Sequence, residues 1–137
     1  MGTWGHGNFE NDTAANYFCE LCSPLMDQIR STAADDGSME SDEYDSEVML
    51  ANIEILTVLV AHIGRAEKDE PGDVMFRFPV PEENKVKEWR TRYLKVWNAY
   101  IDDLDPSPDC KVKRLSHIKA TFDKFIEISG TLPRLES

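Results

Sequence analysis

Four runs of apolar residues, spaced alternately by three and four positions, constrain the fold of this chain more than any other feature. They lie around Phe18, within residues 48–63, around Trp97 and around Phe122. Such spacing places apolar side chains on one face of an α-helix. No segment shows a convincing strand pattern. The sequence therefore predicts an all-α fold, a bundle of four to five helices with a glycine-rich N-terminal segment.

The first and last stripes have the clearest spacing. Ser23-Pro24 interrupts the first one, because proline lacks an amide hydrogen and restricts the residue before it. We therefore expect a kink near Cys22 and a second short helix capped by Ser23. The first stripe consists of Ala14, Phe18, Leu21, Cys22, Leu25 and Ile29. The last consists of Val112, Leu115, Ile118, Phe122, Phe125 and Ser129, and we expect Gly130 to end it.

The two middle stripes predict the centre of the bundle. Twelve of the sixteen residues in 48–63 are apolar and cover the whole circumference, which is typical of a helix buried on most sides. The third stripe has an aromatic face larger than one narrow seam needs, so part of it could meet a partner. Its members are Val86, Trp89, Tyr93, Val96, Trp97, Tyr100 and Leu104.

The chain length of 137 residues fits one domain, and a hydrophobic content of 41% argues against global disorder. We expect a single helical domain over residues 1–137. Three segments interrupt the helical pattern. They are an acidic loop at 31–47, a long proline-containing connection at 65–81 and a loose tail at 131–137.

The net charge of −11 is confined to the first 60 residues, where twelve acids face one base, Arg30. From residue 61 onward, fourteen acids balance fourteen bases. Residues 31–47 hold seven acids and no base, and their mutual repulsion predicts a loop. A solvated, solubilising linker explains such a run, but segregated charge also points to a partner of opposite charge. The candidate partner-binding residues are Asp35, Asp36, Glu40, Asp42, Glu43 and Asp45.

The acidic composition, with a pI near 4.6, argues against nucleic acid and anionic membranes as partners, since both need a basic surface. The first residues lack a positive leader and an apolar core, so we expect no secretory signal and a cytoplasmic protein. Cys19 and Cys22 have the spacing of metal and redox motifs, but no second pair accompanies them. We expect reduced, core-packed thiols, no metal, no cofactor and no catalytic residue.

Glu54 lies within the mostly apolar helix at 48–63 and is the most unusual charged residue of the sequence. A carboxylate in a dry core needs a partner, because an unpaired buried charge costs several kcal/mol. We expect a structural anchor more than acid–base chemistry. The candidate partners are Asn52, His62, the hydroxyls of Tyr93 and Tyr100, tryptophan indoles and backbone amides of the glycine-rich segment.

The opening residues, Met1-Gly2-Thr3-Trp4-Gly5-His6-Gly7-Asn8-Phe9-Glu10-Asn11-Asp12-Thr13-Ala14, follow the pattern Gly-x-Trp-Gly-x-Gly-x-Phe-x-Asn-Asp-x-Ala. This pattern resembles an uncharacterised bacterial family known as domain of unknown function 4259. The likeness continues through Ala51-Asn52-Ile53-Glu54-Ile55-Leu56 and the proline-rich stretch before Trp89, covering residues 1 to about 100. The resemblance implies a small helical bacterial protein and no particular activity.

Two interpretations of the glycine-rich start remain open. In the first, Trp4 and Phe9 plug one end of the bundle before Asn11 and Asp12 cap the first helix. In the second, the segment lines a ligand cleft that contains His6, Asn11 and Asp12. The possible cleft or anchor residues are thus Trp4, His6, Asn11, Asp12 and Glu54.

The leading functional hypothesis is an acidic interaction protein that binds a basic protein, specifically an immunity protein that neutralises a bacterial toxin such as a nuclease. Charge steering would speed encounter, and the acids would occupy a site built for polyanions. One rival is a small enzyme or ligand-binding domain with a cleft near the glycine-rich start. Another is a helical homodimeric adaptor joined through the aromatic helix. The sequence does not specify the oligomeric state.

Overall fold

The computed structural model describes residue 8 and residues 12–41, 43–65 and 81–131, and these residues form helices, turns and no strand. The all-α prediction is confirmed for this part of the chain. Four long helices and two short 3₁₀ helices follow one another. They are α1 (Asp12–Ala33), η1 (Asp36–Met39), α2 (Tyr44–Arg65), α3 (Glu83–Tyr100), η2 (Ile101–Leu104) and α4 (Pro108–Thr131).

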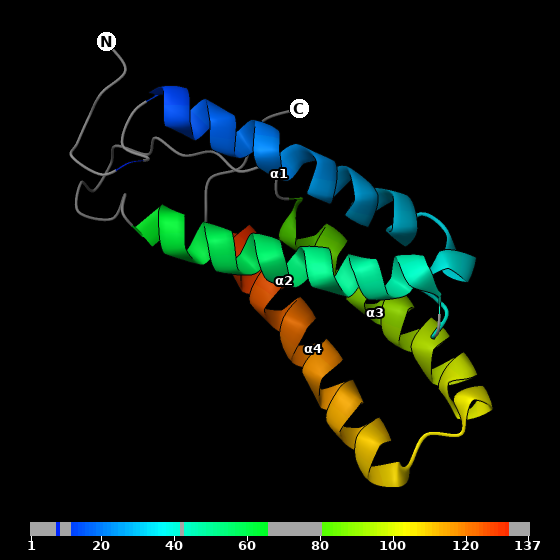
Figure 1. The fold of residues 1–137 in the computed structure, drawn as a ribbon. Coiled ribbons are helices and arrows are strands. Elements are labelled where there is room, and N and C mark those ends of the chain that lie inside the picture. The colour runs from blue at the N-terminus through cyan, green and yellow to red at the C-terminus, as the bar shows by residue number, and fades with distance from the viewer. Residues whose placement is uncertain (1–7, 9–11, 42, 66–80, 132–137) are drawn as a thin grey trace.

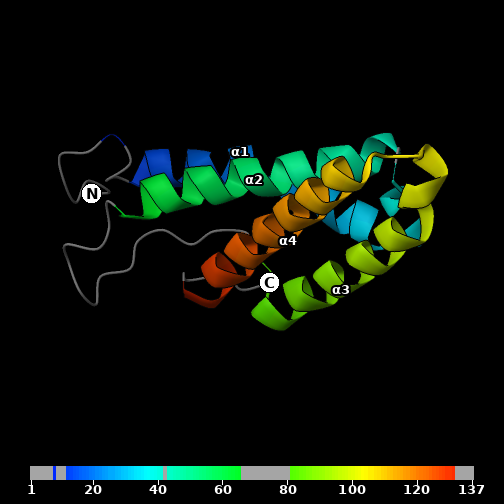
Figure 2. The ribbon, with the colours of Figure 1, turned by 90° about the horizontal axis from the view of Figure 1, so that it is seen from below.

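The helices form two antiparallel pairs that cross each other (Figure 1). Helix α1 runs beside α2, and α3 runs beside α4. Helix α4 lies diagonally across α2, which joins the two pairs, as Figure 2 shows from below. The short helix η1 lies at the turn between α1 and α2 and also contacts α3. The turn of the first pair is therefore fixed against the second pair.

The core lies between the two pairs and contains the apolar faces of all four long helices. The aromatic residues Trp89, Tyr93 and Trp97 are all buried in it, as the sequence predicts for a core helix. Tyr93 also packs against Phe122, with ring centroids 5.4 Å apart. Two methionines outside the predicted stripes, Met26 and Met39, are completely buried as well. Methionine suits such irregular positions because its side chain is unbranched and flexible.

Helix α1 continues through Pro24, so the prediction of a second short helix starting at Ser23 is wrong. Proline at this position removes one intrahelical hydrogen bond. The Ser23 hydroxyl donates to the carbonyl oxygen of Cys19 at 2.8 Å, and Met26 and Ile29 continue the buried face beyond the proline. Packing of that face therefore keeps the helix in one piece. Leu21 lies beside this face and is half exposed, contrary to the prediction.

Helix α2 is buried on one side only, so the prediction of a helix buried on most sides is wrong. Its core face carries Ile53, Leu56 and Val60, whereas 46% of Ile55 and 60% of Val58 are exposed. The reason is the position of α2. Helices α1 and α4 pack against it, and none of the described residues covers the side of α2 that faces away from the core. An apolar circumference alone does not decide which side a helix buries.

The predicted acidic loop at 31–47 is largely helical, which corrects the sequence-based expectation. Its first three residues end α1, η1 occupies its middle, and residues 44–47 begin α2. Repulsion between the acids is overcome because Met39 is buried in the core and Asp35 caps η1. The Asp35 carboxylate accepts hydrogen bonds from the Gly37 amide at 3.2 Å and the Ser38 hydroxyl at 3.0 Å.

The other two predicted interruptions lie mostly outside the described residues. Of the connection at 65–81, the structure describes Arg65, which ends α2, and Pro81, which is buried before α3. Of the tail at 131–137, it describes Thr131, where α4 ends one residue after the expected Gly130.

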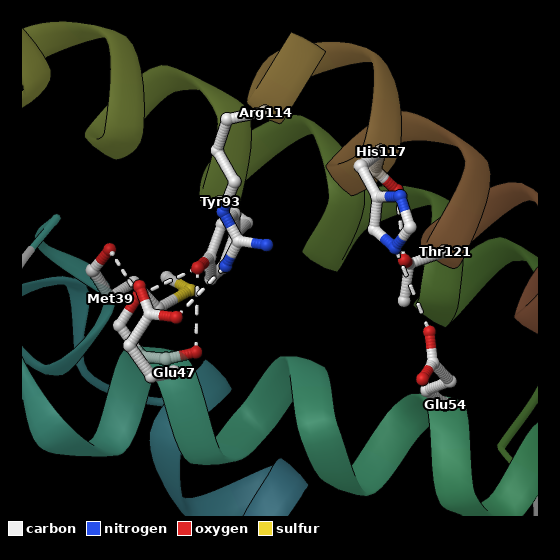
Figure 3. A network of polar contacts seen from close by, with 8 residues as sticks. Met39, Glu47, Glu54, Tyr93, Arg114, His117 and Thr121 are labelled. Atoms are coloured by element: carbon white, nitrogen blue, oxygen red, sulfur yellow. Dashed lines mark hydrogen bonds and ion pairs between the residues drawn. The ribbon is translucent and has the colours of Figure 1, made fainter. Parts of the chain in front are cut away.

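A buried hydroxyl network fixes the start of α2 to α3. The Ser46 hydroxyl lies 3.2 Å from the carbonyl oxygen of Met39 and 2.7 Å from the hydroxyl of Tyr93, and the side chains of Ser46 and Tyr93 are fully buried. Figure 3 shows Met39 and Tyr93. Because the serine has one hydroxyl proton and donates it to Met39, the Tyr93 hydroxyl donates to Ser46. Nearby, the Ser41 hydroxyl donates to the carbonyl oxygen of Trp97 at 3.1 Å.

Replacing Tyr93 by phenylalanine should lower the free energy of unfolding by about 1–2 kcal/mol, because the Ser46 hydroxyl oxygen loses its buried donor. Urea denaturation followed by circular dichroism measures this loss. The matched control is Tyr100→Phe, since 43% of Tyr100 is exposed and it should change stability by less than about 0.5 kcal/mol. Equal effects of the two substitutions would contradict a structural role for the Tyr93 hydroxyl.

The same tyrosine should make the fold sensitive to alkaline pH. Burial raises the pKa of Tyr93 to about 12. A tyrosine in the unfolded chain ionises near about pH 10. Neutral Tyr93 therefore contributes its full stabilisation below about pH 10. The free energy of unfolding then falls by about 2–3 kcal/mol as the pH rises toward 12. Denaturation at several alkaline pH values should show this loss, and Tyr93→Phe should show a smaller one.

Candidate functional site

The predicted partner-binding acids lie at the turn between α1 and α2. We call residues 35–41 and 43–47 the acidic turn. Glu43 and Asp45 are exposed and Glu40 is partly buried, whereas Asp35 caps η1. Asp42 lies outside the described residues. The acids that sequence analysis grouped together therefore differ in role, and Glu43 and Asp45 present their charge most openly.

Two carboxylates of the acidic turn are paired with bases from distant parts of the sequence. Asp36 Oδ1 lies 2.5 Å from Arg92 Nη2 on α3. Glu47 Oε2 lies 2.9 Å from Arg114 Nη2 on α4, a pair that Figure 3 shows. All four side chains are between 32% and 66% exposed, so each ion pair adds at most about 1 kcal/mol of stability. Their main effect is to neutralise part of the negative charge where the turn meets α3 and α4.

A polar groove of about 260 Å³ lies between the last turns of α1 and the first turn of α2. Ser31 and Thr32 line it from α1, Ser38 from η1, and Tyr44 and Asp45 from α2. No lysine or arginine is among its lining residues within the described chain. Sequence analysis identified only Asp45 of this set. Nothing in the sequence around Ser31 and Thr32 indicates that these two residues line a groove together with Tyr44.

Glu54, expected to be buried, is instead exposed over 65% of its side-chain surface, so the predicted buried anchor is wrong. It lies at the edge of α2 that faces α4, and its partner is His117 of α4, absent from the predicted candidates. Glu54 Oε1 lies 3.8 Å from His117 Nε2, close enough for an ion pair when the histidine is protonated (Figure 3). The two residues border a shallow groove of about 140 Å³ between α2 and α4.

Comparison with known proteins gives a family and no function. The sequence matches the domain of unknown function DUF4259 over residues 2–106, more than half of the chain. The chain belongs to the DUF4259 family. No curated protein and no solved structure matches it. The matched region of this DUF4259 protein includes the acidic turn and helices α1, α2 and α3, whereas α4 lies beyond it. The resemblance seen in the sequence is thereby confirmed.

The structure describes only part of the family pattern at the start of the DUF4259 chain. Trp4, His6 and Asn11 lie outside the described residues. Asp12 opens α1, but its side chain is likewise outside the description, as is that of His62 in α2. The proposed plug and the proposed cleft thus both stay predictions.

The cysteines of the DUF4259 protein lie in unlike surroundings. Burial raises the pKa of Cys22 to about 11, and it also raises the pKa of Cys19, so both remain protonated near neutral pH. Cys110 is exposed at the start of α4. Within the described part of the chain, no three histidine, cysteine or acidic side chains are placed to hold a metal ion. The structure thus offers no support for a reactive thiol pair at Cys19 and Cys22.

The helices also allow a test for membrane spans. Among the residues that the structure describes, none of the helices combines the length and apolar character needed to traverse a bilayer.

Proposed function

We propose that this DUF4259 protein is an acidic interaction module that binds a basic protein partner. More specifically, we propose that it is an immunity protein that neutralises a bacterial toxin such as a nuclease. The proposed place of action is the cytoplasm, in keeping with three free cysteines. The observation that carries the proposal is the fixed acidic turn, which presents Glu43 and Asp45 at one end of the helical bundle.

Order in the acidic turn supports this proposal. A disordered acidic segment loses conformational entropy when it binds, whereas a folded one has already lost it. Here Asp35 caps η1, Met39 anchors it in the core, and Ser41, just after η1, donates a hydrogen bond to Trp97 of α3. The exposed carboxylates are therefore held in a defined arrangement that a basic surface can recognise. Their charge also increases the rate of encounter at low ionic strength.

The two rival functions receive less support. An enzyme needs a titratable group in a protected cleft, and the described candidate, Glu54, is largely exposed. A homodimeric adaptor needs aromatic residues of α3 on the surface, but Trp89, Tyr93 and Trp97 are in the core. Tyr100 is partly exposed and is the remaining aromatic residue of α3 that an interface could use.

Charge-neutral variants test the proposal. The test variant carries Glu40→Gln, Glu43→Gln and Asp45→Asn. The matched control carries Glu20→Gln, Glu83→Gln and Glu88→Gln, which removes three charges from exposed positions outside the acidic turn. The two variants and the native protein are each immobilised and exposed to a lysate of the source organism. Quantitative mass spectrometry then identifies the retained proteins, and association rates are measured with each purified candidate.

We expect one basic protein to be retained by the native protein and the control and to be lost from the test variant. Its association rate constant should fall about tenfold between low salt and physiological ionic strength, because screening shortens the range of the field. If it is a toxin, the native protein should also inhibit its activity. Equal retention by both variants, or an association rate independent of salt, would contradict the proposed charge-complementary binding.

A further inference from the structure

The outer face of α2 carries a row of apolar residues that the described part of the fold leaves uncovered. Its members are Val48, Ala51, Ile55 and Val58, which follow one another at steps of three, four and three residues. We call these four residues the α2 stripe. Ala51, Ile55 and Val58 are exposed, and Val48 is partly exposed. Alternating steps of three and four are the spacing with which two helices interlock in a coiled coil, so the α2 stripe has the pattern of a helix–helix contact.

The neighbouring edge of α1 widens this apolar surface. Asn52 Nδ2 donates to Gln28 Oε1 at 2.9 Å, which places Gln28 at the border between α1 and α2. Leu21 and Tyr17 lie seven and eleven residues before Gln28, so they are on the same side of α1. Half or more of each is exposed. The two helices therefore share one apolar outer face, and contiguous exposed apolar surface marks an interaction site.

The outer face of α2 differs from the rest of the acidic half of the chain because it has almost no charge. Between Val48 and Ala61, Glu54 is the one charged residue of the sequence. It lies beside the α2 stripe, at the edge of α2 that faces α4, and its carboxylate is 3.8 Å from His117 Nε2. Asn52, which borders the stripe toward α1, is uncharged. A basic partner finds little charge to bind here, whereas an apolar surface can approach without desolvating an ion.

We infer that the α2 stripe, together with Tyr17 and Leu21, is the interface through which two copies of this chain associate. A chain with a net charge of −11 repels its own copies, and this repulsion is weakest where the two surfaces that meet carry no charge. In a two-fold dimer, the same surface lies on both sides of the interface, so the α2 stripe packs against its equivalent in the second copy. The interface does not use Glu43 or Asp45, so the inference stands independently of the proposed function.

A dimer of this kind accounts for the composition of α2. Twelve of the sixteen residues in 48–63 are apolar, but the core of a single chain uses one side of the helix, with Ile53, Leu56 and Val60. The second copy removes the opposite apolar side from water as well. Burial of apolar surface stabilises association, so the residues that are unexplained in one chain become useful in two.

Sedimentation equilibrium of the purified full chain tests the dimer. We expect the average mass to rise with protein concentration from 15.6 kDa to twice that value. Higher salt should strengthen the association, because screening weakens the repulsion between two acidic chains. This effect is opposite to the salt dependence of binding to a basic partner. A mass of 15.6 kDa at every concentration and salt level would overturn the inference.

Two matched charge insertions locate the interface. Ile55→Asp should raise the dissociation constant of the dimer at least about a hundredfold, because two-fold symmetry places the new charge in the interface twice. The control is Val112→Asp, since Val112 is an exposed apolar residue of α4 outside the proposed interface, and it should change the constant less than about twofold. Circular dichroism verifies that both variants remain helical. Equal dissociation constants for the two variants would contradict an interface on α2.

A cross-link tests the contact without adding a charge. The variant carries Ile55→Cys and also Cys110→Ser, which removes the exposed thiol of Cys110. Oxidation should join the two copies at position 55, because Ile55 is an inner member of the α2 stripe, and mass spectrometry identifies the linked position. The chain with Cys110→Ser alone is the control and should stay unlinked. No link at position 55, under conditions where the native chain is dimeric, would show that the copies meet elsewhere.

Discussion

The hydrogen bond between the buried hydroxyls of Tyr93 and Ser46 joins the start of α2 to α3 within the apolar core. Neither hydroxyl can remain unpaired in the core, so α3 must present Tyr93 to the first turn of α2. The Ser46 hydroxyl in turn donates to Met39, which fixes the last residue of η1. One buried contact therefore couples the aromatic core to the segment with the highest density of negative charge. The order of the acidic turn follows from this coupling.

The fold also distributes the excess of acids in a particular way. Asp35 serves as a cap, Asp36 is paired with Arg92, and Glu47 is paired with Arg114. These contacts allow a strongly acidic segment to pack near the balanced second half of the chain. Glu43 and Asp45 remain exposed, next to a groove lined by hydroxyl groups. The remaining charge is therefore concentrated where a partner can reach it.

Much of the fold could be predicted because three- and four-residue spacing depends only on local sequence. Phe18, Ile53 and Phe122 lie in the core on the helices that their stripes predict. The acidic segment was mispredicted because repulsion is visible in the sequence, whereas the compensating Arg92 and Arg114 lie far along the chain. Glu54 was mispredicted because an apolar circumference does not reveal which positions of α2 remain exposed to solvent beside α4. A lone Met39 within a polar run was the available sign that this segment reaches the core.

The candidate site was harder to predict than the fold. Its acids were recognised from their density, but the groove joins Thr32 and Asp45 from two helices whose relative position depends on η1. No local pattern encodes that proximity. The family match likewise covers the acidic turn without assigning an activity to it. The functional argument therefore depends on the three-dimensional placement of these residues.

Hydrogen exchange in the acidic turn of the free protein tests the account most directly. The amides of Ser38, Glu40 and Glu43 donate to backbone carbonyls within the turn. If the turn is fixed by its contacts with the core, these amides should exchange at least about tenfold more slowly than in an unfolded chain. Exchange at the unfolded rate, with α3 and α4 still protected, would contradict the claim that the fold presents a preorganised acidic surface.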